Sequence, residues 1–204
     1  EKGNLVSRSI PARLLISAFS VIKYLYKTIS PEFKNAGDVI YLLGETHDEC
    51  GGGEYFKLMG AVGNDVPQVD LKRNLKTYLA LEKVIEKELL TSSMSVTSGG
   101  LGIALAKACV GGMVGCKIDV TGMPGGLKSA GVKLFSESQG RILVSVKPQN
   151  VKAFEKFYVG VACVRLGKVI NDGKIIVTDG RDKIIDTNVK KLHTIYHKFS
   201  NSMK

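Results

Sequence analysis

The sequence is organised around one stretch, Leu134-Phe135-Ser136-Glu137-Ser138-Gln139-Gly140-Arg141, in which an apolar pair leads into a compact polar cluster. The apolar run Ile142-Leu143-Val144-Ser145-Val146 follows directly and has the composition of a buried strand. We therefore expect a strand that breaks off at the polar cluster and then resumes. The cluster presents a carboxylate, a hydroxyl and an amide at one point, and these groups suit a phosphorylated, polyhydroxylated ligand. They also suit a plain polar turn, which the eight residues alone favour.

The length and composition fit one globular domain, or one domain together with a segment of a neighbouring domain. The 204 residues are 44% hydrophobic and 24% charged, which allows a buried core and argues against global disorder. No apolar run approaches the roughly eighteen residues of a membrane helix, so we expect no membrane partner. The cysteines are scattered without a CxxC pair, which argues against a metal knuckle or a disulfide framework and favours a reducing cytoplasm. The chain opens at Glu1 with neither Met nor a signal peptide, as a fragment would.

The formal net charge of +10 raises the question of nucleic-acid binding. The basic excess is spread over both ends of the chain, without a Lys/Arg block, an aromatic RNA-binding signature or zinc-finger spacing. A solvated, lysine-rich surface explains the charge, and we expect no nucleic-acid partner.

Two apolar runs near the start of the chain have the length of strands rather than helices. The first covers residues 14–22, and the second covers residues 39–44 and is rich in branched and aromatic side chains. We expect both to be buried strands. On this pattern, the first forty residues belong partly to an upstream unit, and a self-sufficient unit begins at Gly37.

The polar segment 44–55 follows the second strand, at the kind of position where ligand sites of α/β sheets tend to lie. Four side chains of this segment are potential metal ligands: Glu45, His47, Asp48 and Glu49. Adjacent residues rarely converge on one ion, so we assign no metal site here. The consecutive glycines 51–53 instead favour a close approach of the backbone to a neighbour or a ligand.

A helix is predicted over residues 71–90, with Asp70 as its N-cap. Its apolar residues recur every three or four positions and form a stripe that we expect to be buried. The stripe comprises Leu71, Leu75, Tyr78, Leu81, Ile85 and Leu89.

A glycine-rich junction follows a short predicted strand over residues 94–97. Ser98, Gly99 and Gly100 open a second predicted helix, which runs through Ala108. Free N–H groups at such a junction can hold a phosphate, so these three residues are the phosphate-binding candidates. Tight packing of the helix against the sheet explains the glycines equally well, and the pattern is neither a Walker loop nor a full dinucleotide fingerprint.

The second half of the chain alternates strands and helices irregularly. We expect a strand over 116–120, a glycine-rich loop over 121–131, and a helix that begins at Pro148 with Asn150 as its cap. Two short strands, over 160–166 and 174–177, are expected to form a hairpin.

The last predicted helix begins near Asn188 and carries four apolar residues that we expect to be buried: Val189, Leu192, Tyr196 and Phe199. His193 and His197 lie one turn apart beside them. Such a pair can bind zinc, but no third ligand is evident, so we interpret them as surface histidines. The mixture of elements indicates an α+β fold with helices packed on a sheet.

A set of segments, taken in order, resembles the C-terminal part of phosphoribosylformylglycinamidine synthase, the ATP-dependent amidotransferase of purine biosynthesis. The segments are Ile10-Pro11 with 15–18, residues 37–46, Gly52-Gly53-Glu54-Tyr55, Gly99-Gly100-Leu101 with 104–106, residues 134–141, and Leu166-Gly167-Lys168-Val169. They keep the family's order and approximate spacing over nearly the whole chain. The Phe-Ser-Glu-Ser-Gln element distinguishes this family from the related aminoimidazole ribonucleotide (AIR) synthases and selenophosphate synthases.

The resemblance implies the last of four domains in a synthetase that is built from two pseudo-symmetric halves. The implied fold is a three-layer α/β/α domain with a mixed sheet, similar to the C-terminal domain of AIR synthase and partly ferredoxin-like. Residues 1–36 then form the closing strand and linker of an upstream ATP-binding domain. Residues 37–204 form the AIR synthase-related C-terminal domain.

The resemblance also implies an activity, which belongs to the full enzyme. That enzyme uses ATP, Mg²⁺ and glutamine-derived ammonia to convert formylglycinamide ribonucleotide to formylglycinamidine ribonucleotide in the cytoplasm. The implied partners are the upstream ATP-binding domains and a glutaminase subunit or domain, and a second copy of the fragment is a further candidate. The family's catalytic histidine and principal nucleotide ligands lie in upstream segments, so no catalytic residue is assigned here.

Two departures from the family pattern bear on the site. Glu137, Ser138 and Gln139 match a run that holds substrate in the first half of the enzyme. The position matching a substrate-binding Gln is Pro67, and the position matching a metal-linked Asp is Ser95; neither replacement supplies the same chemistry. We therefore expect a degenerate site without a metal ligand and a fragment that is inactive alone. The alternative is a non-catalytic scaffold that docks on a twin domain or a glutaminase subunit.

Overall fold

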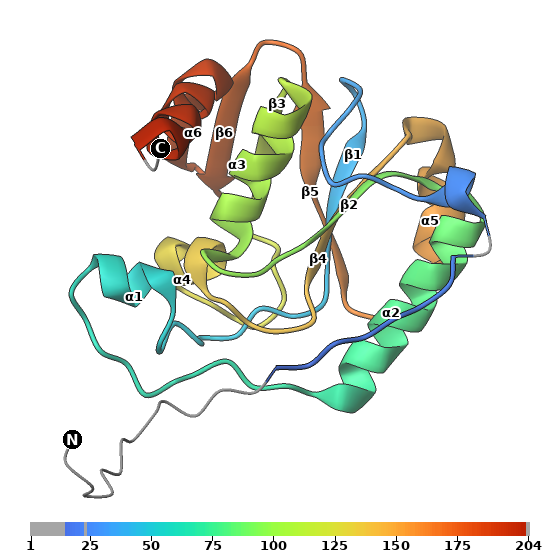
Figure 1. Ribbon diagram of the computed structural model, residues 1–204, viewed down its shortest axis with the longest axis horizontal. Helices are drawn as coiled ribbons and strands as arrows, with labels where there is room; N and C mark the ends of the chain where they lie inside the picture. Colours follow the sequence, from blue (N-terminus) through green and yellow to red (C-terminus); the bar gives the residue numbers. More distant parts are fainter. Residues whose placement is uncertain (1–14, 23, 203–204) are drawn as a thin grey trace, which may run out of the picture.

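The computed structural model describes residues 15–22 and 24–202 and places a seven-stranded mixed sheet at the centre of the molecule (Figure 1). The strands are β1 (Val39–Leu43), β2 (Leu90–Ser95), β3 (Gly115–Asp119), β4 (Ile142–Val146), β5 (Cys163–Ile170), β6 (Lys174–Asp179) and β7 (Asp182–Asn188). Their order across the sheet is β2-β4-β1-β5-β3-β6-β7. Neighbouring strands are antiparallel except β3 and β6, which are parallel.

Helices cover both faces of this sheet. They are α1 (Glu54–Leu58), α2 (Leu71–Glu86), α3 (Gly100–Gly112), α4 (Ala130–Phe135), α5 (Val151–Glu155) and α6 (Val189–Ser202), with short 3-10 turns at Leu25–Lys27, Pro148–Asn150 and Lys156–Tyr158. Figure 1 shows α3 and α6 on one side of the sheet and α2 and α5 on the other. The α+β fold with three α/β/α layers, predicted from the sequence, is confirmed.

Strand β1 contributes to both cores, because its side chains alternate between the two faces of the sheet. Ile40 and Leu42 belong to the core that includes α3, whereas Tyr41 and Leu43 belong to the core that includes α2 and α5. All five residues of β1 are buried, which explains why its sequence is a continuous apolar run.

The strand predicted over residues 14–22 is wrong for the part that the structure describes. Residues 15–22 have no regular secondary structure, and their side chains are exposed, with Phe19 97% accessible. Leu14 lies outside the described residues. A run of strand-forming residues becomes a strand only when another strand supplies hydrogen-bond partners, and none does so within the described part of the chain.

Helix α2 begins as predicted, and the predicted stripe is buried only in part: Leu81, Ile85 and Leu89 pack partly buried against the core, whereas its first three members do not. Asp70 caps it by accepting a hydrogen bond from Arg73 N–H at 2.9 Å. The buried residues are Thr77, Ala80 and Val84, whereas Leu71 is 77% exposed, and Leu75 and Tyr78 are also exposed. Small side chains let the helix lie close to the sheet, and they form the most deeply buried positions, beside the C-terminal half of the predicted stripe.

The predicted strand before the polar cluster is also wrong, because Leu134 and Phe135 end helix α4. Ser129 caps this helix by accepting a hydrogen bond from Val132 N–H at 3.4 Å. The strand after the cluster is confirmed as β4, whose residues are all buried. Asn150 lies at the predicted N-terminus of α5 but makes no side-chain capping bond there; its amide instead donates to Leu89 O at 3.4 Å.

The hairpin predicted between β5 and β6 is wrong, because β3 lies between these strands. Close approach of β3 depends on glycine: a Cβ added at Gly167 would lie 2.1 Å from Lys117 O, and one at Gly115 would lie 2.2 Å from Lys174 O. Strand β6 pairs instead with β7, a strand that the sequence analysis missed because its side chains alternate little and are mostly exposed.

Helix α6 begins at Val189, close to the predicted position, and that residue is buried. Leu192 is partly buried as expected, but Tyr196 is exposed, contrary to the prediction. The side chain of Phe199 lies outside the described residues. The rings of His193 and His197 have centroids 4.2 Å apart.

Candidate functional site

The loop between α4 and β4 is held by the buried side chain of Arg141, which is only 1% exposed. Its Nε atom donates to Ser138 O at 3.0 Å, its Nη1 atom donates to Thr46 Oγ1 at 3.0 Å, and its Nη2 atom donates to Ser136 O. One guanidinium therefore joins two carbonyl groups of the loop to Thr46, in the segment that follows β1. The sequence analysis assigned Arg141 no role, because its burial depends on contacts that are distant in sequence.

Burial lowers the pKa of Arg141 to about 10, because a guanidinium loses hydration in the interior. The charges of Glu49, Cys50 and Glu137 act in the opposite direction and raise this pKa. The side chain therefore remains charged at neutral pH and contributes positive charge beneath the polar cluster.

The two serines of the cluster face the interior. Ser138 Oγ accepts a hydrogen bond from His47 N–H at 3.0 Å and lies 3.1 Å from Ser136 Oγ, and Ser136 Oγ donates to His47 O at 2.7 Å. Both serines are buried, so Ser138 joins the loop to the segment after β1. The Ser138 hydroxyl, for which the sequence analysis predicted a contact to substrate, therefore binds the protein's own backbone in this structure.

Glu137 points toward the start of two helices. Its Oε1 atom accepts hydrogen bonds from Gly99 N–H at 2.8 Å and from Glu54 N–H at 2.9 Å. Gly99 is the N-cap of α3, and Glu54 is the first residue of α1. Gln139 is exposed, and its amide donates to the backbone oxygen of Glu137 at 3.1 Å. The structure thus brings Glu137 to the predicted phosphate-binding junction and leaves Gln139 at the surface.

The phosphate-binding candidates Ser98 and Gly100 border a hollow of about 210 Å³ beside α3. Ser95, Thr97 and Lys107 also line it. The hydroxyls and the ammonium are suited to an anion, but the hollow is smaller than a typical site for a nucleotide-sized ligand. Gly100 N–H donates to Thr97 O at 2.9 Å. Together with the Glu137 contact to Gly99, this bond occupies two N–H groups of the junction.

The acidic segment after β1 contains ion pairs. Glu45 forms a salt bridge with Arg73, which also lies 3.7 Å from Asp70, and His47 Nε2 is 3.5 Å from Glu45 Oε2. Glu49 Oε1 accepts a hydrogen bond from Gln68 N–H at 3.1 Å, next to Pro67. Within the described ranges, no three His, Cys, Asp or Glu residues are placed to hold one metal ion.

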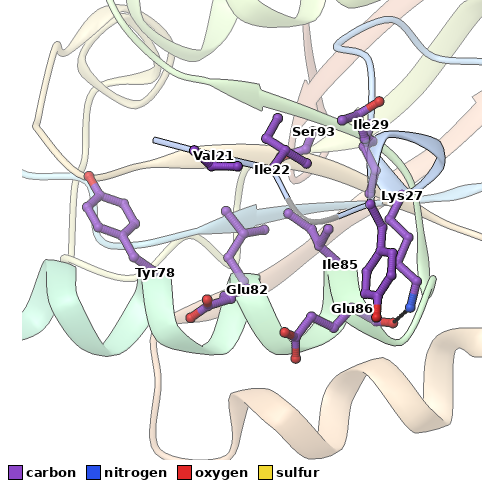
Figure 2. Close-up of a pocket in the computed structure, with 12 residues that line it drawn as sticks. Val21, Ile22, Lys27, Ile29, Tyr78, Glu82, Ile85, Glu86 and Ser93 are labelled. Atoms are coloured by element: carbon purple, nitrogen blue, oxygen red, sulfur yellow. Dashed lines mark hydrogen bonds between the residues drawn. The ribbon is translucent and has the colours of Figure 1, made fainter. Parts of the chain in front are cut away.

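A larger groove of about 620 Å³ lies between α2 and the N-terminal segment. Figure 2 shows side chains of α2, including Tyr78 and Ile85, facing Val21 and Ile22 of that segment. Lys27 Nζ donates to Glu86 O at 3.0 Å at one end of the groove (Figure 2). The lining is mostly apolar and brings together no nucleophile and base, so this groove is suited to docking rather than to catalysis.

Comparison with known proteins defines the class to which this fold belongs. The family described as AIR synthase related protein, C-terminal domain, matches residues 35–180. The chain therefore belongs to this family. Among the described residues, no helix has the length and apolar character to cross a membrane.

Within that family, the chain is similar to the phosphoribosylformylglycinamidine synthase subunit PurL of Caldanaerobacter subterraneus subsp. tengcongensis. The two are 32% identical over 180 residues, which is 87% of this chain and 23% of the relative. The resemblance found in the sequence motifs, to the C-terminal AIR synthase-related domain of this synthase, is confirmed. The chain spans less than a quarter of the relative's length.

Solved structures show the same fold. Thermotoga maritima PurL complexed with FGAR matches with a TM-score of 0.74 at 18% identity, over 83% of this chain and 30% of that chain. The hydrogenase maturation protein HypE in complex with ATP matches with a TM-score of 0.57 at 13% identity, over 81% of this chain and 55% of that chain. At these identities the likeness concerns the fold alone.

Proposed function

We propose that the chain is the C-terminal portion of a phosphoribosylformylglycinamidine synthase and acts in purine biosynthesis. The similarity to PurL over 87% of the chain is the observation that carries this proposal. In the complete enzyme, ATP phosphorylates the amide oxygen of formylglycinamide ribonucleotide, and ammonia then displaces the phosphate. This chain completes the fold of the synthetase and supports the half in which the chemistry occurs.

The described residues around the α3 junction do not fit ATP or Mg²⁺. No described group of three acids, histidines or cysteines could hold a metal ion, and the Ser98 hollow measures only about 210 Å³. In the complete enzyme, both groups are therefore bound by the upstream ATP-binding domains. The free cysteines fit a cytoplasmic enzyme.

Reconstitution tests this proposal. ATP turnover with formylglycinamide ribonucleotide and ammonia should be absent from the isolated chain and from the separate upstream domains, and it should appear when the two are combined. A glutaminase subunit should then allow glutamine to replace ammonia. Turnover by the isolated chain would contradict the inactivity of the fragment, and a combination without any turnover would contradict its membership in the enzyme.

The groove in Figure 2 favours a second candidate function, that of a non-catalytic assembly module. Tyr78 lines this groove, and the exposed Leu71 and Leu75 precede it on α2. Sedimentation velocity at micromolar concentration should show binding to the upstream domains or to a glutaminase subunit. Tyr78→Lys should weaken that binding, whereas Leu58→Lys, at an exposed site on α1, should not. The absence of any association would count against this function.

A further inference from the structure

The junction at the start of α3 is already bound to an anion, which is the chain's own Glu137 carboxylate. The distance from its Oε1 atom to Gly99 N is 2.8 Å, although the two residues are 38 positions apart in sequence. The N-terminal N–H groups of a helix carry partial positive charge and bind carboxylates and phosphates in the same way. The Glu137 oxygen therefore lies where an oxygen of a phosphate would bind.

The position of Glu137 is fixed from several directions. Its N–H donates to Glu49 O at 3.3 Å, and the Arg141 guanidinium holds the carbonyl groups of Ser136 and Ser138 on either side of it. Its carboxylate also accepts a hydrogen bond from Glu54 N–H at 2.9 Å. The carboxylate is therefore held in place by the loop and is not a freely rotating surface group.

Glycines leave the space that this contact requires. A Cβ added at Gly53 would lie 3.2 Å from Glu137 Oε1, and one added at Gly100 would lie 2.6 Å from Ser136 O. Gly99 itself has φ of +80°, a conformation that favours glycine. The glycines at the start of α1 and at the start of α3 therefore allow the loop that carries Glu137 to pack closely against both helices.

We propose that Glu137 is an internal anion that closes the α3 junction to phosphate-bearing ligands. Gly99 N–H is bound by Glu137 and Gly100 N–H by Thr97 O, so an incoming phosphate has to displace the carboxylate. This closure deepens the proposed function, on which it rests, by giving a physical reason for the inactivity of this site. The N–H groups of Gly99 and Gly100 are then already occupied, whereas Ser98 still borders the hollow beside α3.

Amide hydrogen exchange and phosphate titration, followed by NMR on the complete 204-residue chain, test the proposal. In the unmodified protein, the N–H groups of Gly99 and Glu54 should be protected, and millimolar inorganic phosphate should leave their resonances unchanged. Glu137→Gln keeps the shape of the side chain but removes its charge. Exchange at Gly99 should then become about tenfold faster, because charge-assisted hydrogen bonds are roughly twice as strong as neutral ones.

Glu82→Gln is the matched control, because Glu82 is an exposed carboxylate on α2. It should leave exchange at Gly99 unchanged. Phosphate-dependent shifts at Gly99 or Gly100 in the unmodified protein would overturn the proposal, and so would unchanged Gly99 exchange in Glu137→Gln. The titration of the unmodified protein remains decisive even if that variant fails to fold.

The result of the NMR experiment can be distinguished from the result of the reconstitution experiment. Amide protection and phosphate titration require neither the upstream domains nor ATP turnover. An open junction with successful reconstitution would overturn the closure alone, whereas a closed junction without reconstitution would overturn the proposed enzyme membership alone.

Discussion

At the scale of single residues, Arg141 determines the conformation of the polar loop. It donates hydrogen bonds to Ser138 O, Ser136 O and Thr46 Oγ1, all of which lie in the interior. A planar guanidinium can reach three acceptors at once, and a lysine ammonium at the end of a flexible stem lacks this geometry. The loop that presents Glu137 therefore depends on a side chain that is almost fully buried.

Replacing Arg141 should destabilise the protein strongly. Arg141→Ala leaves three buried oxygen atoms without a donor, and we expect the free energy of unfolding to fall by about 3 to 5 kcal/mol. Arg141→Lys should recover only part of this loss. Urea unfolding measures both effects. Arg181→Ala is the control, since Arg181 is exposed and its loss should change the value by less than about 0.5 kcal/mol.

At the scale of elements, α2 shows how packing decides which face of a helix is buried. The apolar stripe predicted from its sequence is exposed at its start, and its later members are only partly buried. The positions that the core buries most deeply are Ala80 and Val84. A small face allows the helix to approach the sheet closely, and the dispersion contacts that result outweigh the size of the individual side chains. The exposed Leu71, Leu75 and Tyr78 then remain available for contact with another surface.

A pair of truncations on α2 separates the two faces. Val84→Ala should lower the free energy of unfolding by about 1 to 3 kcal/mol, because Val84 is fully buried. Leu71→Ala removes more atoms from an exposed site and should change it by less than about 0.5 kcal/mol. Chemical denaturation of the two variants provides the measurement. A larger effect at Leu71 than at Val84 would show that the stripe expected from the sequence is the buried face.

At the scale of the whole molecule, part of the segment before residue 37 packs with the domain. Phe33 is fully buried in the core that includes α3, and its N–H donates to Ala108 O at 3.0 Å. Lys34 Nζ donates to Thr91 O at 2.7 Å, and Ser93 N–H donates to Ser30 O at 3.2 Å. We therefore propose that the folded unit begins near residue 30 rather than at Gly37.

Two phenylalanines of this segment test the boundary with the same substitution. Phe33→Ala should lower the free energy of unfolding by about 3 to 5 kcal/mol, because it leaves a cavity in the core. Phe19→Ala should have almost no effect, since Phe19 is nearly fully exposed. Thermal or urea unfolding of the isolated chain measures both. Equal, small effects would place the boundary after Phe33, as the sequence alone suggested.

The sequence by itself determined the elements whose signals are local. The apolar runs of β1 and β4 predict buried strands, Asp70 predicts the start of α2, and the ordered motifs indicate the family. These features depend on neighbouring residues, so periodicity and capping chemistry are sufficient to find them.

Only the tertiary structure decided how these elements meet. The insertion of β3 between β5 and β6, the buried face of α2, and the bond from Gly99 to Glu137 join residues that are far apart in the chain. Such contacts depend on which surfaces fit together in the folded core. Local patterns of residues contain no information about that fit. The sequence thus identified the Glu-Ser-Gln element, while the fold decided that its carboxylate binds the protein's own backbone.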